Sequence, residues 1–124
     1  MEKNEKMNSF VKFEHELETE YREKLAEAKR KSDVKDVFAE MLVRLLSKIL
    51  PEVKLSIEEI KFDEKEFKYE FTGELGKVIE EISKSSDLKA IINRMYDTAL
   101  HRYKKIEHDE NMDYFRLNST QKRP

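Results

Sequence analysis

The apolar positions near the start of the chain recur at spacings of three and four residues. Projected at about 100° per residue they fall within one stripe, which predicts an amphipathic helix from Phe10 to about Lys31. The residues of this stripe are Phe10, Phe13, Leu17, Tyr21, Leu25 and Ala28. Residues 1–9 are polar, and we expect a disordered N-terminus there because nothing in them can anchor to a core.

A second helix is predicted between an N-cap at Ser32-Asp33 and Pro51, which ends it. Its apolar residues cover about half of the helix circumference, more than an ordinary surface helix needs. They are Val34, Val37, Phe38, Met41, Leu42, Leu45, Leu46, Ile49 and Leu50. This helix is therefore expected at the centre of the core or in a dimer interface.

Residues 52–73 alternate apolar with charged positions at period two, which is typical of half-buried strands. We predict a β-hairpin near 57–72, with strands near 57–62 and 67–72. A competing interpretation is that Ser56 and Glu59 form a capping box, so that 57–61 is a helical turn. The sequence leaves residues 55–61 open between strand and helical turn.

Two more helices are predicted after the hairpin. The first begins near Glu74 and ends near Lys84, and the second begins at Leu88 behind a cap at Ser86 or Asp87 and runs to Ile106. Apolar residues between 112 and 117 either prolong this last helix or dock as a tail. Residues 118–124 look like a disordered tail.

These elements predict a mostly α, α+β fold in one domain over residues 10–117. The order is helix, helix, β-hairpin, helix, helix, and the first, second and last helices are expected to form an antiparallel helical bundle. A chain of 124 residues suits a single domain with one modest core.

Composition excludes several classes of function. The absence of Cys excludes disulfides and thiolate metal sites, and two Gly residues leave no glycine-rich phosphate loop. No apolar run is long enough to span a membrane, and no signal-peptide pattern is present, so we expect a cytoplasmic protein. The charged residues, mostly Lys and Glu, make up 42% of the chain, a composition that leans toward thermophile proteins.

No segment is basic enough to predict a nucleic-acid partner. The formal net charge is -2, and the aromatic-rich segment 52–74 carries more carboxylates than cations, which would repel phosphate. The aromatic residues of the hairpin are therefore expected to pack on the core rather than to stack on bases.

Four residues are the candidates for metal ligands. Asp97, His101 and His108 share one face of the last helix, opposite its apolar stripe, where solvent exposure is the alternative interpretation. Glu14 projects onto the apolar stripe of the first helix, and an inward carboxylate is costly unless it is paired or bound to metal. No Ser stands in a nucleophile-elbow sequence, so we predict no catalytic residues. We also expect no cofactor, and no metal site beyond these four candidate ligands.

The segment from Glu14 to Leu25, with Glu14 seven residues before Tyr21, followed by Phe38-Ala39-Glu40-Met41, resembles the first helical hairpin of ferritin-like, rubrerythrin-like proteins. The segment 99–103 is similar to their third helix. The resemblance implies a di-iron site held by Glu and Glu-x-x-His residues on four helices. This chain has no Glu-x-x-His, so only Glu14 carries over and the resemblance implies that the metal site has been lost.

Two functions follow from these observations. The first is a non-enzymatic helical protein-interaction or scaffold module that acts as a homodimer. The alternative is a degenerate ferritin-like metal-binding protein or oxidoreductase. Self-association is expected because the second helix and the hairpin residues Phe67, Tyr69 and Phe71 offer more apolar surface than a small chain can cover. In the competing monomer, the first and last helices and the 112–117 tail wrap the second helix completely.

Overall fold

The computed structural model describes residues 9–51, 54–63 and 65–122, with side chains as far as Met112. Its elements are α1 (Val11–Glu27), α2 (Lys31–Ile49), the 3-10 turn η2 (Ile57–Glu59), β1 (Ile60–Phe62), β2 (Tyr69–Phe71), α3 (Gly73–Ser83) and α4 (Leu88–Lys122). The two strands form one antiparallel sheet. The mostly α, α+β fold and its element order are confirmed.

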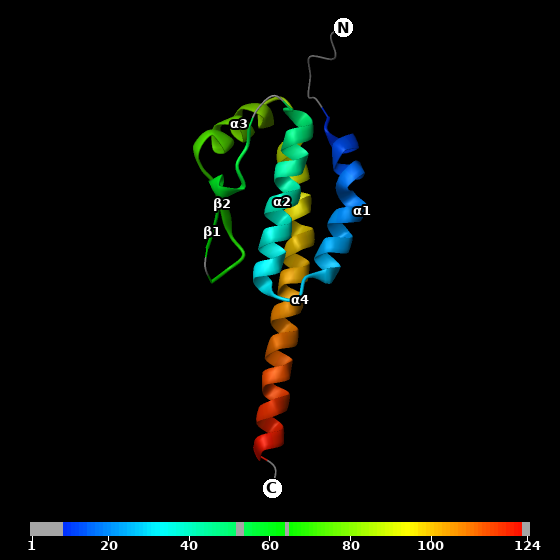
Figure 1. Ribbon diagram of the computed structural model, residues 1–124, viewed down its shortest axis with the longest axis vertical. Coiled ribbons are helices and arrows are strands. Elements are labelled where there is room, and N and C mark those ends of the chain that lie inside the picture. The colour runs from blue at the N-terminus through cyan, green and yellow to red at the C-terminus, as the bar shows by residue number, and fades with distance from the viewer. Residues whose placement is uncertain (1–8, 52–53, 64, 123–124) are drawn as a thin grey trace.

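The α1, α2 and α4 helices pack together as a bundle, and α2 contacts the other two. Figure 1 shows α1 on one side of the α2–α4 pair and the hairpin with α3 on the other side. The wide apolar face of α2 is explained by this position, because it is covered from both sides. Its fully buried residues are Val34, Phe38, Met41, Leu42, Leu45 and Leu46.

An aromatic cluster attaches the hairpin to the bundle. The Phe38 ring of α2 lies 5.7 Å from the Phe67 ring and 5.2 Å from the Tyr69 ring, measured between centroids. Tyr96 of α4 lies 5.9 Å from Phe38, and its hydroxyl donates a hydrogen bond to the Phe67 carbonyl. Such tilted and edge-on aromatic pairs add stability beyond the area that they bury. A two-stranded hairpin needs this support because it is marginal alone.

The boundary between the first two helices differs from the prediction. α1 ends at Glu27 rather than near Lys31, and α2 begins at Lys31, before the predicted cap. The Asp33 carboxylate accepts hydrogen bonds from the N–H groups of Lys29 and Arg30, both at 3.1 Å, which fixes a turn there. The Arg102 guanidinium donates to the carbonyls of Ala26 and Ala28 at the end of α1. A cation at a helix C-terminus is favourable, so α4 helps to end α1.

The strand prediction for residues 57–59 is wrong, and the helical-turn alternative is correct there. Ser56 Oγ accepts a hydrogen bond from the Glu58 N–H and caps η2, so the first strand begins only at Ile60. The second strand is also shorter than predicted, because it covers 69–71 rather than 67–72. Ile60 pairs with Phe71 and Phe62 with Tyr69 across the sheet.

Glu59 joins the hairpin to α3. Its Oε1 accepts a hydrogen bond from the Leu75 N–H at 3.0 Å, which satisfies one free donor in the first turn of α3. Gly73 begins this helix with φ 63°, a conformation that L side chains rarely adopt. A Cβ there would lie 2.6 Å from Glu59 Oε2, so Gly73 is required for both the turn and the contact.

The two ends of the described chain also differ from the prediction. Ser9 Oγ and the Phe10 N–H donate hydrogen bonds to the Asp87 carboxylate, both at 2.9 Å, so the described chain is tied to the start of α4 from residue 9. Residues 1–8 and 123–124 lie outside the described residues. α4 continues to Lys122, so residues 118–122 are helical rather than a disordered tail. Among the described residues, no helix combines the length and apolar character that crossing a membrane requires.

Candidate functional site

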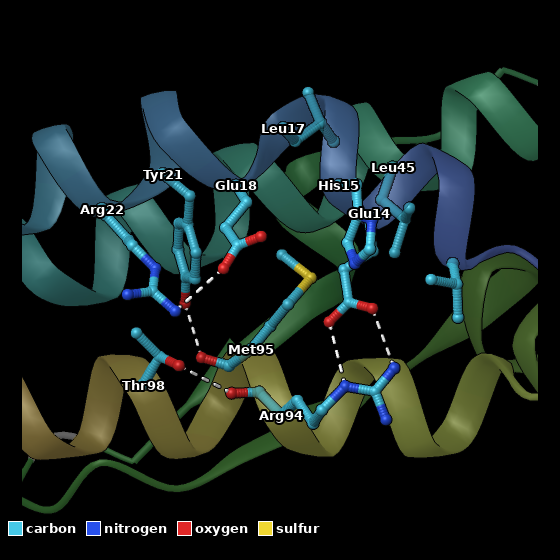
Figure 2. A pocket seen from close by; sticks show the side chains of 11 residues that line it. Glu14, His15, Leu17, Glu18, Tyr21, Arg22, Leu45, Arg94, Met95 and Thr98 are labelled. Atoms are coloured by element: carbon cyan, nitrogen blue, oxygen red, sulfur yellow. Dashed lines mark hydrogen bonds and ion pairs between the residues drawn. The ribbon is translucent and has the colours of Figure 1, made fainter.

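A cleft of about 290 Å³ opens between α1 and α4. Figure 2 shows it with α1 along one edge and α4 along the other. Its apolar lining is Leu17, Tyr21, Leu45 and Met95, and its polar lining comes from both helices. The polar residues are Glu14, His15, Glu18, Arg22, Arg94 and Thr98. The two helices are thus joined at this face by polar side chains in addition to apolar packing.

Glu14 and Arg94 form a two-pronged ion pair across the cleft. Glu14 Oε1 lies 2.8 Å from Arg94 Nη2, and Glu14 Oε2 lies 3.0 Å from Arg94 Nε. The Glu14 side chain is only 16% exposed, and the hydrogen bonds to it raise the pKa of Arg94. An inward carboxylate on an apolar stripe needs a partner, and in this chain that partner is a guanidinium. Both oxygens of the one ligand that the ferritin-like resemblance would carry over are therefore engaged by Arg94.

Tyr21 spans the same cleft deeper down. Its hydroxyl donates a hydrogen bond of 2.6 Å to the Met95 carbonyl of α4, and burial raises the pKa of the phenol above its ordinary value. A phenol in this environment keeps its proton and acts as a donor, not as a base. Tyr21 therefore fastens α1 to α4.

The outer polar groups of the cleft have their partners on the same helix. Glu18 Oε2 lies 2.8 Å from Arg22 Nη2 one turn later, and Thr98 Oγ1 donates to the Arg94 carbonyl. His15 is exposed at the rim. Among the described hydrogen bonds, none joins a nucleophile in this cleft to a base. The hydrogen bonds and ion pairs that the structure describes in this cleft position the two helices against each other.

The structure does not bring the four metal-ligand candidates together. Asp97, His101 and His108 are exposed on α4, while Glu14 lies on α1 against Arg94. Within the part of the chain that the structure describes, no group of three or more His, Cys, Asp or Glu residues is placed to hold a metal ion. The solvent-exposed interpretation of Asp97, His101 and His108 is the one that the structure supports.

The hairpin surface on which self-association was predicted is largely covered within one chain. Phe67 is 3% exposed, and its ring lies 5.1 Å from the Tyr103 ring of α4. Tyr69 and Phe71 are half-buried. The expectation that Phe67 contributes leftover apolar surface is wrong, because the hairpin folds onto α2 and α4.

The second candidate surface is the α4 arm, which we define as residues 107–122. Figure 1 shows this end of α4 running on beyond the loop between α1 and α2. Ile106, at 6% exposure, is the last buried residue among the described side chains of α4. Lys31 contacts the arm only at its base, with Nζ 3.6 Å from Glu107 and 3.9 Å from Glu110. Met112 is 45% exposed, a high value for a large apolar side chain.

Sequence reasoning found Glu14 and missed its partner. The inward position of Glu14 indicated that a cation or a metal must face it, but Arg94 lies outside the apolar stripe of its own helix and several other cations could have served. For residues 112–117 the sequence leaves two alternatives open, a prolonged helix or a docked tail, and in the structure the helix is prolonged. No signal in the sequence selects between a prolonged helix and a docked tail.

Protein-family models, curated proteins and solved structures were each compared with this chain, and none of them matches it.

Proposed function

We propose that this chain is a helical protein-interaction module that forms a homodimer through the α4 arm. The observation that carries the proposal is the continuation of α4 from Ile106 to Lys122, past the last buried side chain that the structure describes in this helix. At 1.5 Å per residue the arm is about 24 Å long. None of the described elements lies beside its outer part (Figure 1).

An arm that packs on no other element gains little stability from its surroundings. Most helical stability in proteins comes from packing of an apolar face rather than from intrinsic propensity. The arm includes Met112, Tyr114, Phe115 and Leu117 near its middle. At helical spacing Met112 and Phe115 share one face of the arm and Tyr114 and Leu117 share another. A partner helix that packs on one of these pairs would add stability to the arm.

The order of charges along the arm favours a second copy of the same chain as that partner. The half nearest the bundle is acidic, and the outer half is basic. The acidic residues are Glu107, Asp109, Glu110 and Asp113, and the basic ones are Arg116 and Lys122. Two arms paired antiparallel place the acidic half of each beside the basic half of the other, whereas parallel pairing places like charges together.

The length of the arm fits the same arrangement. A two-fold axis between residues 114 and 115 sets Asp113 opposite Arg116 and Glu107 opposite Lys122. The outer end of each arm then reaches the base of the partner's bundle, and the two bundles lie at opposite ends of the pair. Two-fold dimers are the commonest symmetric assemblies, and each surface patch in them faces its own copy.

Sedimentation equilibrium over a range of concentrations tests the proposal, with one matched pair of variants. Met112→Glu puts a charge into the paired arm, while Ile57→Glu makes the same change at a residue of nearly equal exposure, 46% against 45%, in η2. We expect the unaltered chain and Ile57→Glu to approach twice 14.9 kDa as concentration rises, and Met112→Glu to stay near 14.9 kDa.

The remaining outcomes contradict the proposal in distinct ways. A mass of 14.9 kDa for the unaltered chain at every concentration removes the dimer. If Ile57→Glu dissociates the dimer and Met112→Glu does not, the interface lies at η2 rather than on the arm.

Salt gives a further expected result. Charge pairing holds part of the proposed interface, so the dimer should weaken as the salt concentration is raised.

A further inference from the structure

A second cavity, of about 520 Å³, lies on the opposite side of α4 from the cleft. It is bounded by β2, α3 and the first turns of α4, the elements grouped around α3 in Figure 1. Its volume is within the range of small-molecule sites, about 300–1,000 Å³. The dimer proposed above does not involve any of its lining residues.

The inner walls of this cavity are apolar and partly aromatic. Tyr69 and Phe71 of β2 are half-buried, with ring centroids 5.1 Å apart and planes inclined by 60°. Ile79 of α3 and Ile92 of α4, at 8% and 3% exposure, complete the apolar surface. An aromatic or apolar ligand body would therefore bury these walls favourably.

Gly76 fixes the wall between β2 and α3. A Cβ at this position would lie 2.9 Å from the Phe71 carbonyl oxygen, closer than real Cβ atoms approach. The glycine therefore lets α3 pack directly on the strand that carries the two aromatic rings. The backbone of Gly76 therefore forms this side of the cavity.

A buried hydroxyl in the cavity lining lacks a hydrogen-bond partner within the described chain. Ser83 Oγ is buried and unpartnered there, whereas two other hydroxyls on or next to α4 are satisfied. Ser86 Oγ donates to the Ile82 carbonyl at 2.7 Å, and Thr98 Oγ1 donates to the Arg94 carbonyl at 3.0 Å. Buried polar atoms are nearly always paired, so this hydroxyl has a hydrogen bond left to donate once its side chain turns toward the cavity.

Among the residues that line the cavity, lysines outnumber carboxylates by two to one. Lys84 and Lys89 are exposed in its lining, against the single carboxylate of Glu80, and Asn93 adds an amide. Lys84 Nζ also lies 3.8 Å from Glu81, at an exposed and therefore weak ion pair. From the apolar walls, the unpartnered hydroxyl and this charge we propose that the cavity binds a small aromatic molecule that carries a carboxylate.

In the proposed complex, the aromatic body lies against Tyr69 and Phe71. The carboxylate accepts hydrogen bonds from Ser83 Oγ and from the Lys89 ammonium. Hydrogen bonds to a charged group are the stronger kind, so the carboxylate is expected to dominate selectivity. The Glu80 carboxylate lies in the same lining and repels the ligand carboxylate.

Titration with naphthoate and with its neutral amide, naphthamide, tests this proposal. The chain has no Trp, so the fluorescence of the probes can be followed directly. We expect naphthoate to bind about tenfold more tightly than naphthamide, a difference of the size that one charged contact supplies. Lys89→Gln should remove most of that preference, and Glu80→Gln should increase it.

Two further variants distinguish a direct ligand contact from an effect of overall charge or of protein stability. Lys77→Gln changes an exposed lysine of α3 outside the lining and should leave both affinities unchanged. Ser83→Ala should weaken naphthoate binding and leave the free protein at least as stable, because it removes an unpartnered buried hydroxyl. Equal affinity for the two probes, no binding of either, or equal losses in Lys77→Gln and Lys89→Gln would overturn the proposal.

Discussion

The two halves of α4 share one continuous helical backbone and differ in what surrounds it. In the half up to Ile106, the apolar side chains that recur at helical spacing are buried against α1, α2 and the hairpin. In the α4 arm, the side chains described from His108 to Met112 are all exposed. The helical backbone therefore continues past the last buried side chain that the structure describes, and packing on the bundle stabilises only the first half of α4 among the described side chains.

The largest expected contrast is in the free energy of unfolding at the centre of the bundle. Phe38 is fully buried and touches four other aromatic rings, so Phe38→Ala leaves a cavity that no neighbour can fill. We expect a loss of about 3–5 kcal/mol, measured by chemical denaturation. Met112→Ala, measured below the concentration at which chains associate, should change the same quantity by less than about 0.5 kcal/mol. Similar losses at both positions would break the comparison.

The next effect concerns the attachment of α1 to the buried half of α4. Tyr21→Phe removes the hydroxyl that donates to the Met95 carbonyl, while it keeps the ring and its packing. The expected loss is about 1–2 kcal/mol of unfolding free energy, since a buried hydrogen bond is removed. An unchanged midpoint in denaturant would show that apolar packing alone joins the two helices.

A smaller effect is expected from ion pairs, whose coupling energy should differ between the buried half of α4 and the base of the arm. A double-mutant cycle with Glu14→Gln and Arg94→Gln should give a coupling energy of about 0.5–1 kcal/mol, limited by the exposure of Arg94. The matched cycle with Lys31→Gln and Glu107→Gln, at the base of the arm, should give a coupling near zero. Its side chains are 34% and 47% exposed and its single contact is 3.6 Å long. Equal coupling energies would contradict the expectation that the Glu14–Arg94 pair is the stronger of the two.

The smallest effect is the response of the bundle to acid. Backbone N–H groups hold the pKa of Asp33 and that of Asp63 below their ordinary value. A carboxyl whose pKa is lowered by folding adds stability above its unfolded pKa of about 4, and this stability is lost as pH falls through the lower folded pKa. Asp33→Asn should therefore reduce Tm slightly at neutral pH and flatten its decrease in acid. An unaltered pH profile of Tm would contradict this assignment.

Much of the fold could be predicted because it depends on periodicity. The stripe from Phe10 to Ala28, the wide face of α2 and the apolar set of α4 each specify a helix and its buried side. The errors lie where local hydrogen bonds compete with periodicity. Ser56 turns residues 57–59 into η2, and Asp33 draws the end of α1 back to Glu27.

The candidate site was less predictable because it depends on contacts between distant residues. The sequence showed that Glu14 needs a partner, but the 80 residues that separate it from Arg94 carry no signal of their pairing. The burial of Phe67 likewise depends on Tyr96 and Tyr103, which the hairpin meets only after folding. The extension of α4 beyond Ile106 could not be predicted either, because a single sequence does not show what packs against this part of the helix.

The central claim, an antiparallel pair of α4 arms, is tested most directly by one distance between two copies of the chain. The protein has no Cys, so Lys104→Cys introduces a single site for a spin label on an exposed position of α4. Pairing about an axis between residues 114 and 115 predicts a backbone separation of about 33 Å between the two labelled positions. A separation of about 10 Å would mean parallel helices, and the absence of any dipolar coupling between labels at high concentration would mean that the arms do not pair.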